Sequence, residues 1–178
     1  MWKGDISIFD FKKSQLAKKL KADKDFTPTP VNDGDELYPN GIFVFNITKM
    51  IEYIAENPNE FEPVAVEVDD FSEDFSSIDE SHVDSVDVSR PVILAEISPG
   101  RYNLIDGNHR MEKARRMGIK NMSGFKLNVK QHVKFLTSQK AYLSYVEYWN
   151  SKVKHSSKTK PLHATSLRKC QSMSVDGR

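Results

Sequence analysis

The chain of 178 residues is 38% hydrophobic and 29% charged, with a formal net charge of +1. This length suits one hydrophobic core with a tail and excludes a series of large domains. No apolar run approaches the roughly 20 residues that a membrane span needs, and no apolar signal segment opens the chain. The single cysteine, Cys170, cannot form an internal disulfide or a cysteine zinc site. We therefore expect a cytoplasmic protein that does not bind a membrane.

Charge is divided unevenly along the chain. Residues 1–109 contain ten Lys and Arg against 22 Asp and Glu, whereas residues 110–178 contain 16 against three. Such asymmetry is typical of proteins with a polyanionic partner such as DNA. It is equally compatible with two halves that neutralise each other across the fold. Both interpretations stay open.

The first part of the chain is predicted to be an arm, a strand and a helix. Lysines interspersed with leucines favour a short basic helix over 14–22, and Pro and Asn-Asp-Gly residues predict a loop over 25–34. An apolar run predicts a strand over 42–45. Asn46 can then cap a helix over 47–57. The predicted core face of that helix consists of Met50, Ile51 and Ile54.

An acidic segment follows a predicted strand at 63–68. Residues 67–87 contain nine carboxylates and no Lys or Arg. One interpretation is a magnesium site, and another is a solvated helix or loop held by aromatic residues. A third is that the segment covers a basic helix farther along and competes with DNA, so that deleting residues 70–87 tightens DNA binding. The metal ligands would be Asp69, Asp70 and Asp74, and the anchoring residues Phe71, Phe75 and Ile78.

A glycine lies between a predicted strand at 101–105 and a predicted helix. Met111, Ala114 and Met117 recur at helical spacing, so Gly107 falls in the strand-to-helix turn. The first N–H groups of a helix lack intrahelical acceptors and attract anions. His109 and Arg110 add donors there. The turn is therefore predicted to bind phosphate.

The segment Asp106-Gly107-Asn108-His109-Arg110 resembles the loop of the ParB/sulfiredoxin superfamily. The similarity extends over roughly residues 36–130. It includes Tyr38–Gly41, the helix at 47–57, the strand at 63–68, a hairpin over 90–105, the helix end Ala114–Ile119 and a strand at 122–129. The resemblance implies an α/β or α+β domain with a small mixed sheet flanked by helices, whose loop holds the phosphates of a nucleotide or nucleic acid.

Two departures narrow the functions that the resemblance implies. Asn108 stands where sulfiredoxins need a cysteine, so repair of oxidised peroxiredoxin is not expected. His109 stands where plasmid-partition ParB proteins carry a second arginine, and the residues after 130 are too few for their helix-turn-helix and dimerisation modules. The activities that the resemblance still implies are those of its other members: free-serine kinase, nucleotide hydrolase and nuclease.

We assign provisional roles to the loop and its neighbours. Gly107, Asn108, His109 and Arg110 are predicted to bind phosphate. His109 and Arg110 would also stabilise phosphoryl transfer. His109 is alternatively a general acid, or a turn histidine whose ring is satisfied by the backbone. Asp106 either holds a phosphate-bound Mg²⁺ or braces the turn. Glu36 is carried over from the serine-kinase relatives as a catalytic carboxylate, with Glu96 and His132 as alternatives. Candidate nucleic-acid contacts are Lys113, Arg115 and Arg116.

The last part of the chain is predicted to be a helix and a tail. Aromatic residues at helical spacing predict a helix over 139–152, whose stripe either packs in the core or stacks on bases. Residues 154–178 are rich in Lys, Ser and Thr and are expected to be disordered. The predicted organisation is an arm and loop (1–35), a domain (36–153) with an acidic insertion (69–89), and a basic tail (154–178).

The leading functional hypothesis is a nucleoside triphosphatase that uses ATP or another nucleotide with Mg²⁺, and that also acts as a nuclease on DNA. A nonenzymatic nucleotide- or DNA-binding regulator is the first alternative. A small-molecule kinase is the second.

Overall fold

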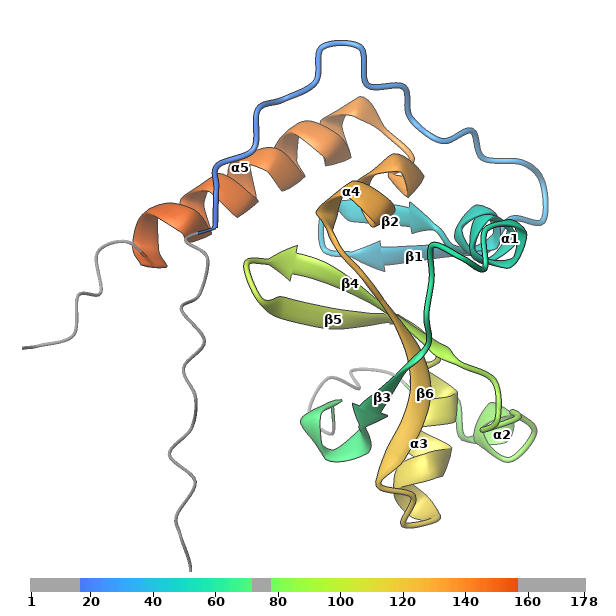
Figure 1. Cartoon of the computed structure of the whole chain (residues 1–178). Helices are drawn as coiled ribbons and strands as arrows, with labels where there is room; N and C mark the ends of the chain where they lie inside the picture. The colour runs from blue at the N-terminus through green and yellow to red at the C-terminus, as the bar shows by residue number, and fades with distance from the viewer. Residues whose placement is uncertain (1–16, 72–77, 157–178) are drawn as a thin grey trace, which may run out of the picture.

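Figure 1 shows the computed structural model, which describes residues 17–71 and 78–156. The fold is mixed α/β: a two-stranded and a four-stranded sheet are flanked by helices, as expected in its coarse form. The described residues include no helix whose length and apolar character would let it cross a membrane. Most of the predicted basic tail lies outside the described part of the chain.

A hairpin and a helix begin the domain. Its elements are β1 (Leu37–Asn40), β2 (Phe43–Asn46) and α1 (Ile47–Glu56). The Asn46 side chain accepts a 3.0 Å hydrogen bond from the N–H of Lys49, which confirms the predicted N-cap. Met50 and Ile54 are buried and Ile51 is half-buried, so the predicted core face is confirmed.

The four-stranded sheet carries the loop at one end of its edge strand. Strands lie in the order β3-β6-β4-β5, with β4 parallel to β6 and antiparallel to β5. Helix α3 connects the edge strand β5 to β6, and therefore begins where β5 ends. The elements are β3 (Val64–Glu67), β4 (Val92–Ser98), β5 (Arg101–Asp106), α3 (Asn108–Arg116) and β6 (Asn121–Leu127).

Each face of this sheet packs against its own core. In β4, Val92 and Leu94 face α3, whereas Ile93 and Ala95 face the core shared with α1 and the C-terminal helix. This two-sided burial explains why β4 is apolar throughout rather than alternating. On α3, Met111 and Ala114 are fully buried, but Met117 is 60% exposed because the helix ends before it. Met117, the last of the three residues at helical spacing, is the C-cap of α3 and does not share its buried face.

The C-terminal helix provides the second core with aromatic side chains. It is α5 (Gln139–Ser156), somewhat longer than predicted, and it follows α4 (Val129–His132) and the turn η2 (Val133–Phe135). Tyr142, Tyr145 and Trp149 are buried in the core cluster. Core packing, not base stacking, is therefore the role of the aromatic stripe.

The N-terminal arm is extended along α5 and is not helical over residues 17–22. The predicted helix over 14–22 is wrong in this described portion; residues 14–16 lie outside it. The N–H and C=O of Leu20 bond to the Asn150 side chain at 2.8 and 2.9 Å, and Trp149 Nε1 donates to the carbonyl of Lys18 at 3.0 Å. Side chains of α5 satisfy the arm's backbone groups, so the arm needs no helical hydrogen bonds.

Candidate functional site

The turn between β5 and α3 depends on a glycine. Gly107 is the N-cap of α3 and has a φ of 101° in the left-handed region. A Cβ at this position would lie 2.6 Å from Val92 Cγ1. No side chain caps the helix, and its first hydrogen bond runs from Met111 N–H to the Gly107 carbonyl at 2.9 Å. The N–H groups of residues 108–110 therefore have no acceptor within the helix, which makes this end suitable for an anion.

Arg110 is held beside the turn by a nearly buried ion pair. Its Nη2 lies 2.7 Å from Asp106 Oδ2, with the two side chains 12% and 14% exposed. The same nitrogen lies 3.3 Å from the carbonyl of Pro91, and buried Nε has no hydrogen-bond partner among the described residues. Asp106 thus pairs directly with Arg110, and not with the backbone of the turn as one sequence interpretation expected. A phosphate-bound Mg²⁺ at Asp106 stays a prediction. An oriented arginine with a vacant donor suits phosphate oxygens.

The Asp106–Arg110 pair opens onto a pocket of about 480 Å³ between α1 and the sheet. Its walls are mostly apolar, and Arg90 adds a further cation at its edge. A largely apolar concavity with a few charged groups at one side is the usual form of a small-molecule site. The lining residues are Ile51, Ile54, Ala55, Pro58, Phe61, Pro63, Arg90, Pro91, Ile93, Asp106, Arg110 and Phe125.

His109 faces the opposite direction, towards α2 (Glu80–Val83). Its Nε2 accepts a 3.2 Å hydrogen bond from the backbone N–H of Asp79, and its ring meets that of His82 edge to face at 5.1 Å. The structure therefore separates His109 from the pocket that Arg110 lines, although the two residues are adjacent in sequence.

The basic residues of α3 are neutralised by carboxylates within the fold. Glu112 is only 5% exposed and binds Arg115 at 2.6 and 2.8 Å and Arg116 at 2.6 Å. These hydrogen bonds, that of Arg115 first, lower the pKa of Glu112 from 4.5 to about 2. Sequence reasoning missed Glu112, although its spacing of three and four residues from the two arginines is a known ion-pair signal.

The acidic segment does cover α3. Glu80 forms two 2.7 Å bonds with the guanidinium of Arg116, and Lys113 Nζ donates at 2.9 Å to the carbonyls of Asp84 and Val86. All three predicted nucleic-acid contacts, Lys113, Arg115 and Arg116, thus have partners within the protein. Competition between this segment and DNA stays a prediction.

The other proposed catalytic groups lie away from the loop pocket. Glu36 is exposed beside the first turn of α1, where its N–H donates to Thr48 Oγ1 at 2.8 Å, and it does not line the pocket. Glu96 accepts a 2.9 Å bond from Gly100 N–H in the β4–β5 turn. His132 is fully buried between Phe45 and Tyr145, in a packing role.

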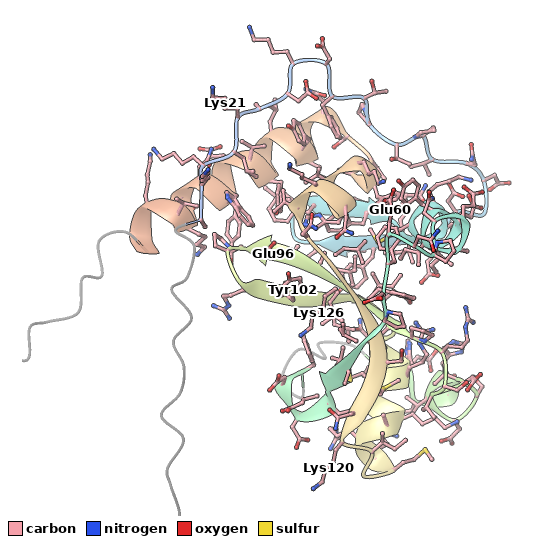
Figure 2. All side chains as sticks on the ribbon, in the orientation of Figure 1. Lys21, Glu60, Glu96, Tyr102, Lys120 and Lys126 are labelled. Atoms are coloured by element: carbon pink, nitrogen blue, oxygen red, sulfur yellow. The ribbon has the colours of Figure 1, made fainter. Side chains whose placement is uncertain are left out.

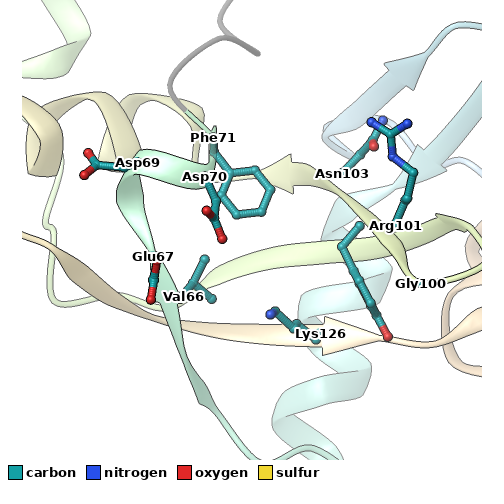
Figure 3. Close-up of a pocket in the computed structure, with 10 residues that line it drawn as sticks. Val66, Glu67, Asp69, Asp70, Phe71, Gly100, Arg101, Asn103 and Lys126 are labelled. Carbon is teal, nitrogen blue, oxygen red and sulfur yellow. The ribbon is translucent and has the colours of Figure 1, made fainter. Parts of the chain in front are cut away.

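A second, more polar pocket of about 550 Å³ lies over the far end of the sheet (Figure 3). Glu67, Asp69 and Asp70 line one side, and Arg101 and Lys126 the other. Asp74, the third suggested magnesium ligand, falls outside the described residues. Within the described ranges, no three His, Cys, Asp or Glu residues come together as a metal site. Its mixed charge makes this pocket a poorer phosphate site than the uncapped helix end.

Comparison with protein-family models, curated proteins and solved structures finds no match for the chain. The relationship to the ParB/sulfiredoxin superfamily therefore stays a prediction.

Proposed function

We propose that this chain is a nucleotide-binding domain of the ParB/sulfiredoxin type. In this proposal the phosphates contact the N–H groups of residues 108–110 and the Arg110 guanidinium, and the rest of the nucleotide occupies the 480 Å³ pocket. One observation carries the proposal: the uncapped, glycine-initiated helix end and an apolar pocket share Arg110. The order of hairpin β4–β5, helix α3 and strand β6 along the chain also supports the proposal, because the resemblance implies a hairpin, a helix and a strand in that order.

Arg110 would gain a second partner when phosphate binds. In the free protein one guanidinium nitrogen binds Asp106, and Nε makes no hydrogen bond to the described residues. An incoming phosphate supplies an acceptor for Nε and for the helix N–H groups, while Asp106 keeps the guanidinium oriented. Removing Asp106 should therefore loosen the arginine without removing the phosphate site. Whether Mg²⁺ accompanies the nucleotide is tested by adding it separately.

Hydrolysis of the bound nucleotide, with nuclease activity on DNA as its extension, is the enzymatic form of the proposal. Arg110 is placed to stabilise charge on a transferring phosphoryl group. The alternative is a regulator that binds without turnover. It is favoured by the position of His109, whose Nε2 is occupied by Asp79 N–H and which points away from the pocket. Release of inorganic phosphate from the best-bound nucleotide distinguishes the two.

The binding test is thermal unfolding with a panel of nucleoside di- and triphosphates, with and without Mg²⁺. A ligand at one hundred times its Kd adds about 2.7 kcal/mol, which raises the Tm of a domain of this size by about 5–10 °C. Arg110→Lys leaves a cation for Asp106 but removes the planar donor set, so the nucleotide-induced shift should largely disappear. Arg101→Lys, in the other pocket, is the matched control and should keep it. A shift that is equal in both variants, or absent in the wild type, contradicts the proposal.

A further inference from the structure

The N-terminal arm and α5 form one continuous surface on the opposite side of the molecule from α3. Besides the bonds to Asn150 and Trp149, the ring of Phe26 stacks on Tyr142 at 3.9 Å, and Asp23 N–H donates to the Tyr142 hydroxyl at 2.8 Å. The arm is thus fixed along most of the helix. Its backbone and apolar side chains face α5, which leaves its polar side chains on the outside (Figure 2).

This arm–α5 surface, defined as residues 17–25 and 139–156, is rich in lysine. It contains seven lysines against three carboxylates, whereas the whole chain has a net charge of only +1. All seven lysine side chains are exposed. Among the residues that the structure describes, the four lysines of the arm form no ion pair, in contrast to the arginines of α3. These four are Lys18, Lys19, Lys21 and Lys24.

The arm–α5 surface contains both the first and the last of the residues that the structure describes. Residue 18 bonds to Trp149 near the C-terminal end of α5, so the segments before residue 17 and after residue 156 leave the fold close together. By sequence, residues 157–178 hold five Lys and Arg against one Asp, and Lys12 and Lys13 shortly precede the arm.

We propose that the arm–α5 surface binds the phosphodiester backbone of nucleic acid. Exposed lysines contact phosphates as point charges without reading sequence, so binding should be sequence-independent and weakened by salt. The apolar stripe of α5 is used in the core, and the large apolar side chains that the helix leaves exposed are Leu143 and Tyr148. These two are five residues apart and so lie on different sides of the helix, which gives no continuous apolar face of the kind that a membrane-bound helix needs. This inference does not depend on the nucleotide site, and it places nucleic acid on a different surface from α3.

The test is fluorescence anisotropy with a labelled duplex DNA of arbitrary sequence, over a series of salt concentrations. The test variant replaces Lys18, Lys19 and Lys21 with Gln. The matched control replaces three other exposed lysines with Gln. Lys120 lies in the turn before β6, Lys126 on β6 and Lys130 on α4. Figure 2 shows Lys21 and Lys120 at opposite ends of the molecule. Both variants lower the net charge of the protein by the same amount. A difference in their affinity for DNA therefore shows which surface the DNA binds.

The wild type and the control should bind alike. The test variant should lose about tenfold or more in affinity at low salt, and the slope of log affinity against log salt should fall by up to about 3. Circular dichroism and thermal unfolding confirm that each variant is folded. Equal losses in both variants overturn the proposal, because they indicate a diffuse charge effect. The proposal is also overturned if the wild-type protein does not bind DNA, or if it binds anionic phospholipid vesicles and not DNA.

Discussion

Gly107 is the residue on which the geometry of the loop depends. Its left-handed φ turns the chain from β5 into α3, and Val92 occupies the space where a side chain would begin. Because Gly107 is the N-cap of α3 and has no side chain, the helix end also lacks a capping side chain. A glycine at this turn lets the backbone approach a ligand closely, and the helix N–H groups that follow it have no acceptor within the helix.

Gly107→Ala should be destabilising for two separate reasons. The left-handed conformation costs about 1–2 kcal/mol for alanine, and the clash with Val92 adds about 1–3 kcal/mol. Gly100→Ala is the matched control, because Gly100 also has a positive φ of 72° but open space around its Cβ position. Urea unfolding should show a clearly larger loss for Gly107→Ala. Equal losses would mean that Val92 moves aside freely.

His132 should make stability depend on pH. Burial lowers its pKa from 6.5 to about 4, against the opposing effect of its hydrogen bond to the Glu96 carbonyl. Between pH 6.5 and 4, His132 is protonated in the unfolded chain but stays neutral in the folded protein. The free energy of unfolding therefore falls as the pH drops through this window, and His132 does not affect it above the window.

His132→Phe tests this assignment. At pH 8 the variant should lose about 1–2 kcal/mol, because the hydrogen bond to Glu96 is removed. As the pH falls towards 4, the wild type should lose stability relative to the variant, so the difference narrows. The measurement is urea unfolding across the pH range. A constant difference between pH 7 and 4 would show that His132 does not carry the dependence.

Among the secondary-structure elements, α3 has two arginines that pair with carboxylates, and these two carboxylates differ greatly in burial. The Glu112 side chain is 6% exposed and pairs with Arg115 and Arg116, whereas that of Glu80 is 71% exposed and pairs with Arg116 alone. Exposed pairs contribute little because water screens them, and removing one partner of a buried pair leaves an uncompensated charge.

Glu112→Gln should therefore destabilise the protein by about 2–3 kcal/mol, whereas Glu80→Gln should leave the unfolding midpoint almost unchanged. Glu80→Gln should act locally: hydrogen exchange should accelerate in α2 and its flanking turns, whose link to Arg116 is weakened. The two variants remove the same charge from the same ion-pair network. Comparable losses of global stability would contradict the distinction drawn from burial.

Sequence patterns predicted the elements that are marked by local signals, such as a cap, a turn glycine or helical spacing of apolar residues. They missed the elements that depend on tertiary contacts. The capped helix α1, the turn at Gly107 and the buried stripe of α5 were confirmed because local chemistry determines them. The strand β1 was missed because it is a half-exposed edge strand that contains Pro39. The arm was assigned to a helix because its docking on α5 is not visible in its own sequence.

The candidate site was predictable in position but not in arrangement. The loop and its glycine follow from the strand-to-helix pattern, whereas the Asp106–Arg110 pair and the outward-facing His109 depend on what surrounds the turn. The pocket beside Arg110 joins α1 and β4, which are distant in sequence, so no local pattern indicated it.

At the scale of the whole molecule, charge is sorted between surfaces. Carboxylates in and beside α3 neutralise its arginines, whereas the arm–α5 surface keeps an excess of lysine. Part of the positive charge of residues 110–178 is therefore neutralised at α3, whereas the lysines of α5 stay exposed. The pocket beside Arg110 takes that residue from the start of α3 and no residue from the arm–α5 surface.

The most direct test of the nucleotide proposal is a titration followed by backbone amide NMR. The nucleotide that gives the largest thermal shift is added to isotope-labelled wild-type protein. The account predicts the largest chemical-shift changes at the amides of residues 107–110, followed by residues that line the pocket, such as Ile54, Arg90 and Phe125. Changes centred on the polar pocket around Arg101 and Lys126, with the 107–110 amides unmoved, would contradict it.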